Sequence, residues 1–193
     1  MCYEAARKRK KKIMFLIKGD VWDTKKIGGL WLNLWKDVGK QYPDVVFDWE
    51  HEDTWFGYFM MHPEHYDVVA ALGLAGDMIT DPIATLAYGT RALTPSANIA
   101  PDGFMVFQTI HGTGTGIEKG TANPIAMIRA VGLMMEYFYK MPEIKDLLEK
   151  AIRTVLAHGY RTIDIYLKKN PEQMLVGTKQ MTDLIIKEMM HAS

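Results

Sequence analysis

Apolar residues recur along this chain with two spacings. Short apolar runs at 12–17, 45–49, 66–71, 93–98 and 104–110 predict strands. Apolar positions three and four apart predict helices at 24–41, 53–61, 76–91, 123–139, 142–158 and 177–190, and residues 5–11 have the pattern of the end of a further helix. Short strands that alternate with longer helices predict an α/β fold. A chain that opens within a helix is expected to be a fragment or one piece of a two-chain assembly.

Composition and charge narrow the classes of partner. Of the 193 residues, 48% are hydrophobic and 24% are charged, and 23 basic residues balance 23 acidic ones, so nothing in the global charge indicates nucleic acid or an acidic membrane. No apolar run is long enough to span a bilayer. The single cysteine, Cys2, allows no internal disulfide, which predicts a cytoplasmic protein.

The basic run from Arg7 to Lys12 has two interpretations. Six consecutive basic residues are typical of a nuclear-targeting or nucleic-acid patch. They also suit the solvated end of a helix that precedes a buried strand, because cations complement the negative end of the helix dipole. We favour the second interpretation, so neither a nucleic acid nor a membrane is a predicted partner.

Several charged residues are candidates for chemistry. Lys18 follows a predicted buried strand, where partial desolvation suits a lysine for acid–base work, although an ordinary surface lysine fits the same pattern. Asp77 and Asp81 are four residues apart and would share one helix face, and Asp53 precedes them. Converging carboxylates favour Mg²⁺ or Mn²⁺ between them. Capping of a helix that begins after Gly76 is the alternative role for Asp77.

The segment from His111 to Gly120 is a glycine-rich loop, and glycines allow a backbone to approach a phosphate or a flat base closely. It has neither the Walker pattern nor the dinucleotide fingerprint, so a mobile surface loop stays open as an alternative. Asn123, just past the loop, could bond an adenine edge or cap the next helix. His62 and His65 are three residues apart across Pro63 and are expected to be poor metal partners.

The order of these motifs resembles that of the isocitrate/isopropylmalate dehydrogenases, a family of β-decarboxylating dehydrogenases. The matching segments begin with YEAARKRKKK and IKGDV and continue through EDTW, HPEHYDVV, GDMITD, TPSANI, HGTGTGIEKGTANPIAMI and VGTKQMTDLIIKEM. The resemblance runs from Tyr3 to Met190 and corresponds to the C-terminal half of a family chain. It implies a truncated form of the family fold, with a mixed sheet flanked by helices. Residues 1–92 would form the small, dimerisation part, and residues 93–193 would belong to the cofactor-binding large domain.

The resemblance also implies roles for the candidate residues. Asp53, Asp77 and Asp81 would bind Mg²⁺ or Mn²⁺, and Lys18 would be the catalytic acid–base residue, with Lys18 and Asp53 reaching into a neighbouring chain's site. His111, Gly112, Thr113 and Asn123 would contact the cofactor, which is NAD or NADP with NAD slightly favoured. The reaction would oxidise a 2-hydroxy acid and release CO₂, and the stretch KKIGGLWL favours isocitrate over isopropylmalate.

Departures from the family pattern keep a second interpretation open. Asp20, Thr54 and Gly73 stand where family members have asparagine, and the half that supplies the substrate-binding arginines is absent. The first interpretation is therefore half of an enzyme, inactive alone, which forms a homodimer or a hetero-oligomer with a chain that carries the N-terminal half. The second is a non-catalytic regulatory or structural subunit that keeps the dimer surface and the nucleotide loop.

Overall fold

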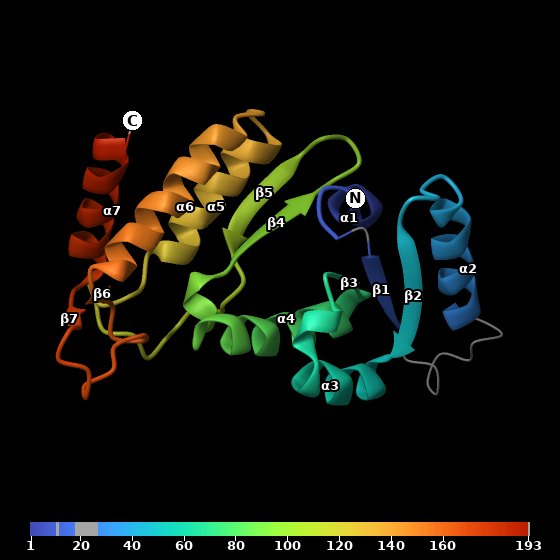
Figure 1. The fold of residues 1–193 in the computed structure, drawn as a ribbon, viewed down its shortest axis with the longest axis horizontal. Coiled ribbons are helices and arrows are strands. Elements are labelled where there is room, and N and C mark those ends of the chain that lie inside the picture. Colours follow the sequence, from blue (N-terminus) through green and yellow to red (C-terminus); the bar gives the residue numbers. More distant parts are fainter. Residues whose placement is uncertain (11, 18–26, 193) are drawn as a thin grey trace. The chain divides into compact units, whose positions relative to one another are not determined.

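The computed structural model of the chain describes residues 1–10, 12–17 and 27–192 (Figure 1). The chain folds as two compact units, Met1–Ile79 and Thr80–Ser193. The boundary between these units lies within one helix, between Ile79 and Thr80. The division at about residue 92 into a dimerisation part and a cofactor-binding part stays a prediction. Among the described residues, no helix has both the length and the apolar character that crossing a bilayer requires.

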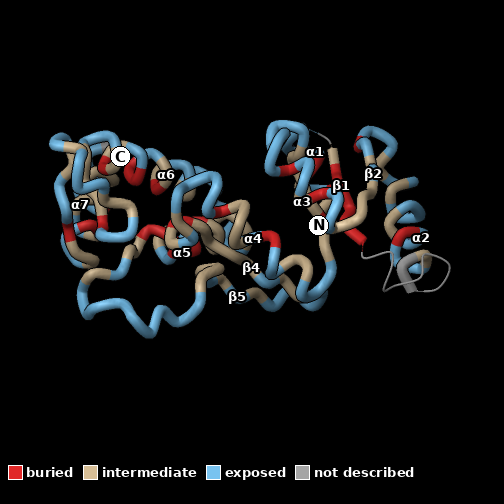
Figure 2. The backbone as a smooth tube through the Cα atoms, turned by 90° about the horizontal axis from the view of Figure 1, so that it is seen from below, coloured by how far each residue is buried: buried red, intermediate tan, exposed pale blue. Residues whose placement is uncertain are grey.

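The first unit is built around a small parallel sheet in the order β2-β1-β3. The central strand β1 is buried from Ile13 to Ile17, as parallel strands flanked on both sides usually are (Figure 2). The elements of this unit are α1 (Cys2–Arg7), β1 (Lys12–Ile17), α2 (Ile27–Gly39), β2 (Val46–His51), α3 (Glu52–Met61), the 3₁₀ turn η1 (Pro63–His65), β3 (Val68–Ala70) and the start of α4 (Gly73–Tyr88).

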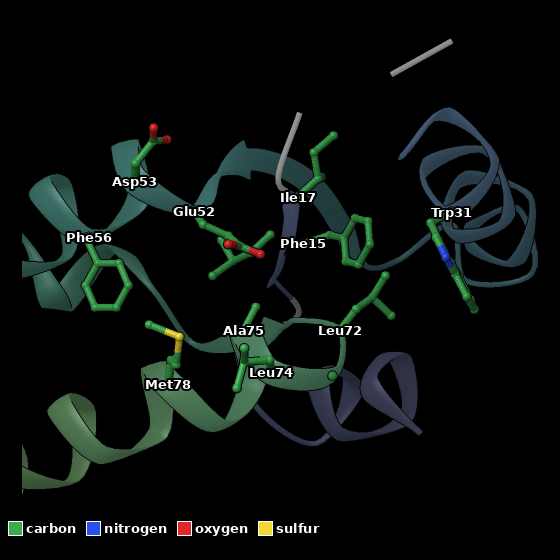
Figure 3. Close-up of a pocket in the computed structure, with 12 residues that line it drawn as sticks. Phe15, Ile17, Trp31, Glu52, Asp53, Phe56, Leu72, Leu74, Ala75 and Met78 are labelled. Carbon is green, nitrogen blue, oxygen red and sulfur yellow. The ribbon is translucent and has the colours of Figure 1, made fainter. Parts of the chain in front are cut away.

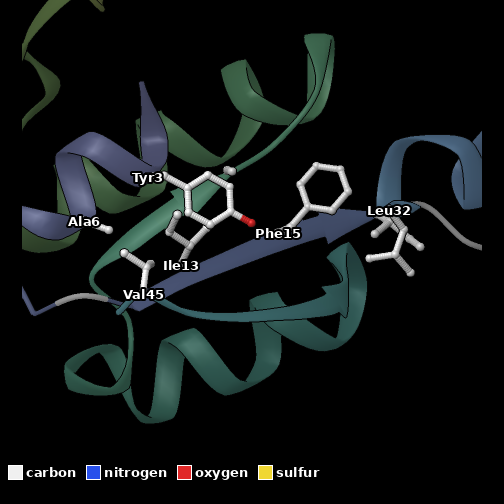
Figure 4. Close-up of a cluster of buried hydrophobic side chains, with 8 residues drawn as sticks. Tyr3, Ala6, Ile13, Phe15, Leu32 and Val45 are labelled. Carbon is white, nitrogen blue, oxygen red and sulfur yellow. The ribbon is translucent and has the colours of Figure 1, made fainter. Parts of the chain in front are cut away.

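Alternate residues of β1 face a core to which α1 and α2 both contribute. Ile13 and Phe15 are fully buried there, beside Tyr3 of α1 and Leu32 of α2 (Figure 4). The Tyr3 hydroxyl donates a hydrogen bond of 2.8 Å to the carbonyl of Trp35, so the phenol satisfies its polar end while its ring packs in the core. The first helix is therefore an integral part of this unit.

The basic run makes ion pairs within its own unit. The Arg7 guanidinium binds Asp44 at 2.8–3.2 Å, and Arg9 Nε donates to Asp67 at 2.8 Å. The Asp67 side chain is only 3% exposed, and its burial opposes ionisation, but the bonds from Arg9 and the Lys10 N–H lower the pKa of its carboxyl. These contacts support the interpretation of the run as a helix end packed against its own domain.

The second unit contains an antiparallel strand pair and three long helices. Its core is formed by Ile125 of α5, Ile152 of α6 and Met181 and Ile185 of α7, which are all at most 1% exposed. After the end of α4 the elements are η2 (Arg91–Leu93), β4 (Pro95–Ile99), β5 (Met105–Thr109), α5 (Ile125–Tyr137), α6 (Pro142–Ala157), β6 (Tyr160–Arg161), β7 (Met174–Leu175) and α7 (Thr178–Ala192).

The predicted α/β class with helices flanking sheets is confirmed. Within the described ranges the strands form three small sheets, two parallel and one antiparallel. Helix α4 begins at Gly73, three residues earlier than predicted, and ends at Tyr88. Helix α3 begins at Glu52, one residue earlier than predicted, and its N-cap is His51.

Candidate functional site

Two of the three predicted metal ligands lie on one helix. Asp77 and Asp81 are both in α4, four residues apart, and that spacing places them on the same helix face. Capping by Asp77 is excluded, because the helix begins four residues before it at Gly73. The third, Asp53, is exposed in the first turn of α3, and its Oδ1 accepts the Thr54 N–H at 2.9 Å.

Sequence reasoning missed the partner of Asp81. The Arg91 guanidinium donates through Nη1 to Asp81 Oδ2, and both side chains are partly exposed, Arg91 at 50% and Asp81 at 38%. Arg91 begins η2, which closely follows the end of α4, so the turn between them returns the arginine to the helix. The carboxylate that the family pattern assigns to a metal is thus neutralised by a cation of the same chain.

A largely apolar cavity of about 770 Å³ opens in the first unit beside Asp53 (Figure 3). It lies between the end of β1, the first turn of α3 and the start of α4. The Glu52 carboxylate reaches into the space bounded by Phe15, Phe56 and Met78, and Asp53 projects from its rim. Ile17 also lines the cavity, and Lys18 follows Ile17 in the sequence. Lys18, the predicted catalytic residue, lies outside the described residues.

The predicted cofactor residues lie on the connection between β5 and α5. His111 is half-buried, and its Nδ1 is 2.9 Å from the Gly112 carbonyl oxygen. A carbonyl oxygen can only accept, so Nδ1 is the donor in this contact. Gly112 and Thr113 are exposed. Farther along, Gly114 and Gly120 have φ angles of 61° and 84°, which favour glycine.

Asn123 takes the capping role that was one of its two predicted alternatives. Its Oδ1 accepts the Ile125 N–H at 3.0 Å, at the start of α5. Its Nδ2 donates to Asp164 Oδ2 at 3.1 Å. An amide group has two donor hydrogens and two acceptor lone pairs, so these contacts use half of its capacity. The remaining donor hydrogen and acceptor lone pair of Asn123 could therefore still contact a base.

Asp164 is a second residue that sequence reasoning missed. Its carboxylate accepts hydrogen bonds from Asn123, from Thr90 Oγ1 at 3.3 Å and from the buried Thr162 hydroxyl at 2.6 Å. It thereby ties the turn after α4 and the start of α5 to the segment after β6. The signal in the sequence is weak, because Thr90 and Asn123 are 74 and 41 residues away and a lone aspartate after a threonine has no motif.

The start of α7 holds the end of the glycine-rich loop. The Thr178 N–H donates to the Gly120 carbonyl at 2.8 Å, and the Thr178 hydroxyl donates to the Ala122 carbonyl at 2.5 Å. A Cβ on Gly177 would lie 2.8 Å from the Gly120 carbonyl oxygen, so only glycine fits this approach. The loop is anchored at its C-terminal end on α7.

Comparison with known proteins identifies the family that the chain resembles. The family model for isocitrate/isopropylmalate dehydrogenase matches residues 1–185. The chain is 34% identical to 3-isopropylmalate dehydrogenases of Geobacter sulfurreducens, over 96% of this chain and 50% of that protein, and of Aquifex aeolicus, over 97% and 50%. An isocitrate dehydrogenase structure from Methylococcus capsulatus is 31% identical with a TM-score of 0.85, over 97% of this chain and 53% of that one. The chain thus spans about half the length of the curated relatives it matches.

Proposed function

Because the chain belongs to the isocitrate/isopropylmalate dehydrogenase family, we propose that it is the metal- and cofactor-binding half of a β-decarboxylating 2-hydroxy acid dehydrogenase. The observation that carries this proposal is the pair Asp77 and Asp81 on one face of α4, within a family match that covers nearly the whole chain. Cys2 as the lone cysteine is consistent with action in the cytoplasm.

Three carboxylates suit Mg²⁺ or Mn²⁺, because both ions prefer oxygen ligands. We assign the ion to Asp77 and Asp81 of one chain with Asp53 of a neighbouring chain. A bound ion would supply Lewis-acid polarisation of the substrate's oxygens. Lys18 is proposed to hold and deliver the proton in the reaction, in keeping with its place after the cavity-lining Ile17.

A nicotinamide cofactor supplies the hydride acceptor, and its adenosine part is assigned to the loop after β5. His111 lies on this loop with Nδ1 bonded to the Gly112 carbonyl, Gly112 and Thr113 are exposed, and Asn123 keeps part of its amide capacity. NAD is slightly favoured over NADP, because no basic pair in the loop would match the extra phosphate.

We propose that the substrate-binding arginines lie in an N-terminal half of the fold, because this chain matches about half the length of its relatives. Several arginines of this chain already bind groups of their own unit: Arg7 binds Asp44, Arg91 binds Asp81 and Arg129 binds Glu149. We therefore propose a partner chain that carries the N-terminal half of the fold. Its proposed substrate is a 2-hydroxy acid. The curated relatives are named 3-isopropylmalate dehydrogenases, which does not support the preference for isocitrate, whereas one similar structure is an isocitrate dehydrogenase, so both acids have to be tested.

A second copy of the chain is proposed to cover the surface formed by α3 and the first turns of α4, within the first unit. Tyr58, Met60, Met61, Leu74 and Met78 are at least half exposed there. Large apolar side chains exposed together mark interaction surfaces. The apolar sequence of α3 would place Trp55 and Phe59 on this surface too, but they pack inward at 0% and 8% exposure.

The Arg91–Asp81 contact favours the alternative function, a non-catalytic subunit of the same family. In a subunit that binds no metal, a guanidinium can occupy the carboxylate that would otherwise hold the ion, as Arg91 does with Asp81. Such a chain would keep the dimer surface and the adenosine-binding loop and would regulate or support an active partner.

The lone chain should have no measurable activity toward isocitrate or isopropylmalate, and addition of an N-terminal half from a related 3-isopropylmalate dehydrogenase should restore it. Positioning of the substrate against the cofactor supplies several kcal/mol of barrier lowering, and that half supplies the arginines that position it. The measurement is NADH or NADPH production, with sedimentation to establish assembly. Assembly without activity for every such partner would support the non-catalytic subunit, and activity of the lone chain would disprove the need for a partner.

Replacement of Arg91 by glutamine should strengthen Mn²⁺ binding. An exposed ion pair is worth at most about 1 kcal/mol, so release of Asp81 should raise the affinity by up to about fivefold. Asp77→Asn should weaken binding at least about tenfold, because one ion–carboxylate contact is lost. Calorimetric titration measures both changes, and Arg153→Gln is the matched control. Equal affinities for the wild type and Asp77→Asn would show that the ion binds elsewhere.

A further inference from the structure

Two histidines and a glutamate meet on the surface of the first unit, at the turn between α3 and β3. The His62 and His65 rings stack with centroids 5.1 Å apart and an interplanar angle of 16°. Glu64 Oε1 is 3.4 Å from His62 Nδ1 and 3.8 Å from His65 Nε2. The sequence-based expectation that these histidines make poor metal partners was therefore wrong in its geometry.

The reason is the backbone conformation that Pro63 begins. Residues 63–65 form a 3₁₀ turn, in which side chains three positions apart eclipse each other, so His62 and His65 lie on one side. The turn is closed by hydrogen bonds from the His65 N–H to the His62 carbonyl at 3.1 Å and from the Tyr66 N–H to the Pro63 carbonyl at 3.2 Å. Proline fixes its own φ, so it stabilises this turn.

The turn is also attached at both ends to the rest of the unit. The His62 N–H donates to the Tyr58 carbonyl at 2.7 Å in the last turn of α3. The Lys12 ammonium donates to the His65 carbonyl at 3.0 Å, and so connects the turn to β1. The backbone that carries the two rings is thus held in place before any ion arrives, which lowers the ordering cost of binding.

The spacing of the three side chains is close to that of a transition-metal site. Imidazole and carboxylate ligands bind Zn²⁺ at about 2.0–2.2 Å, so tetrahedral ligand atoms are about 3.4 Å apart. The ligand atoms here lie within 4.8 Å of one another, and the side chains are 50–65% exposed and able to close that difference by rotation. We propose that His62, Glu64 and His65 bind one ion of the Zn²⁺ or Ni²⁺ type, with the remaining coordination positions open to solvent.

The ligand atoms of the cluster suit this role, because two imidazoles and one carboxylate form a mixed nitrogen and oxygen set. Neutral imidazoles are ligands of Zn²⁺, Ni²⁺ and Cu²⁺, whereas Mg²⁺ and Mn²⁺ favour oxygen. The site is therefore chemically distinct from the one assigned to Asp53, Asp77 and Asp81, and it does not depend on the proposed dehydrogenase function.

Calorimetric titration of the whole chain with Ni²⁺ alone, and separately with Zn²⁺, tests the proposal at mildly alkaline pH, because protons compete with the metal for its ligands. One ion per chain is expected. His62→Ala and His65→Ala should each weaken binding at least tenfold, and Glu64→Gln should weaken it less. Because an ion that binds only the folded state stabilises it, added Zn²⁺ should also raise the melting temperature of the wild type and not of His62→Ala.

His158→Ala is the matched control, because His158 is exposed in the second unit, and it should bind Ni²⁺ as the wild type does. Asp77→Asn should likewise keep the wild-type affinity for Ni²⁺ while its affinity for Mn²⁺ falls. This difference would show that the two ions bind at different sites. The proposal is overturned if the double variant His62→Ala/His65→Ala keeps wild-type Ni²⁺ affinity, or if the wild type binds no ion. A stoichiometry of one ion to two chains would show that two chains form the site together, which contradicts the proposal that one chain supplies all three ligands.

Discussion

Replacement of Arg129 by methionine should lower the free energy of unfolding by about 3 kcal/mol, at the lower end of the range for an ion pair that loses one partner, because the pair with Glu149 is only partly buried. Arg129 is 10% exposed and binds both Glu149 oxygens, at 2.9 and 3.0 Å, while its Nη1 donates to the Leu93 carbonyl at 2.7 Å. Its guanidinium also lies over the Tyr88 ring at 5.1 Å. Methionine fills similar space but leaves the carboxylate and the carbonyl unpaired. Denaturation by urea measures the loss.

Two further variants identify the cause. Arg129→Met/Glu149→Leu should regain much of the stability, because it removes both charges and leaves only the carbonyl unpaired. Lys179→Met breaks the exposed Lys179–Asp183 pair, whose side chains are 88% and 57% exposed, and should cost no more than about 0.5 kcal/mol. A loss for Arg129→Met as small as that of Lys179→Met would show that the buried network contributes little.

The elements that periodicity predicted well are those whose apolar positions are also the buried ones. Strand β1 and helices α6 and α7 occur within two residues of their predicted bounds, because their apolar positions coincide with buried ones. The pair β6 and β7 was missed, since two-residue strands have no period to detect. Their pairing depends on Gly159, whose φ is 88° and whose Cβ would lie 2.2 Å from the Glu172 carbonyl oxygen. No local pattern reveals that approach.

In the candidate site, too, the sequence predicted the features that are local and missed the contacts between distant segments. The spacing of Asp77 and Asp81 is local to one helix, and the sequence predicted their shared face correctly. The partners of those residues are not local: Arg91 folds back onto Asp81 through a turn, and Asp164 gathers donors from distant segments. His62 and His65 show that a local pattern can also mislead, because Pro63 was taken to separate them and instead begins the turn that joins them.

In the complex restored by an N-terminal half, Lys18→Met should reduce turnover by about 10²–10⁴-fold, the usual contribution of a general acid–base group. Methionine matches the length of lysine but cannot hold or deliver a proton. Mn²⁺ and cofactor binding should stay within twofold of the wild-type complex, because neither is assigned to Lys18, so the loss should fall on kcat and leave KM nearly unchanged. Initial rates, with sedimentation to confirm assembly, measure the effect.

The matched control is Lys36→Met, which removes an exposed lysine from α2 and should leave the rate of the restored complex unchanged. If Lys18→Met and Lys36→Met complexes turn over equally, another group moves the proton, and the Glu52 carboxylate inside the cavity is the next residue to substitute. If Lys18→Met instead raises KM with kcat intact, the lysine binds substrate without proton transfer. Only a loss in kcat with assembly and metal binding preserved is the result expected of an acid–base lysine, because that group acts in the transition state and not in binding.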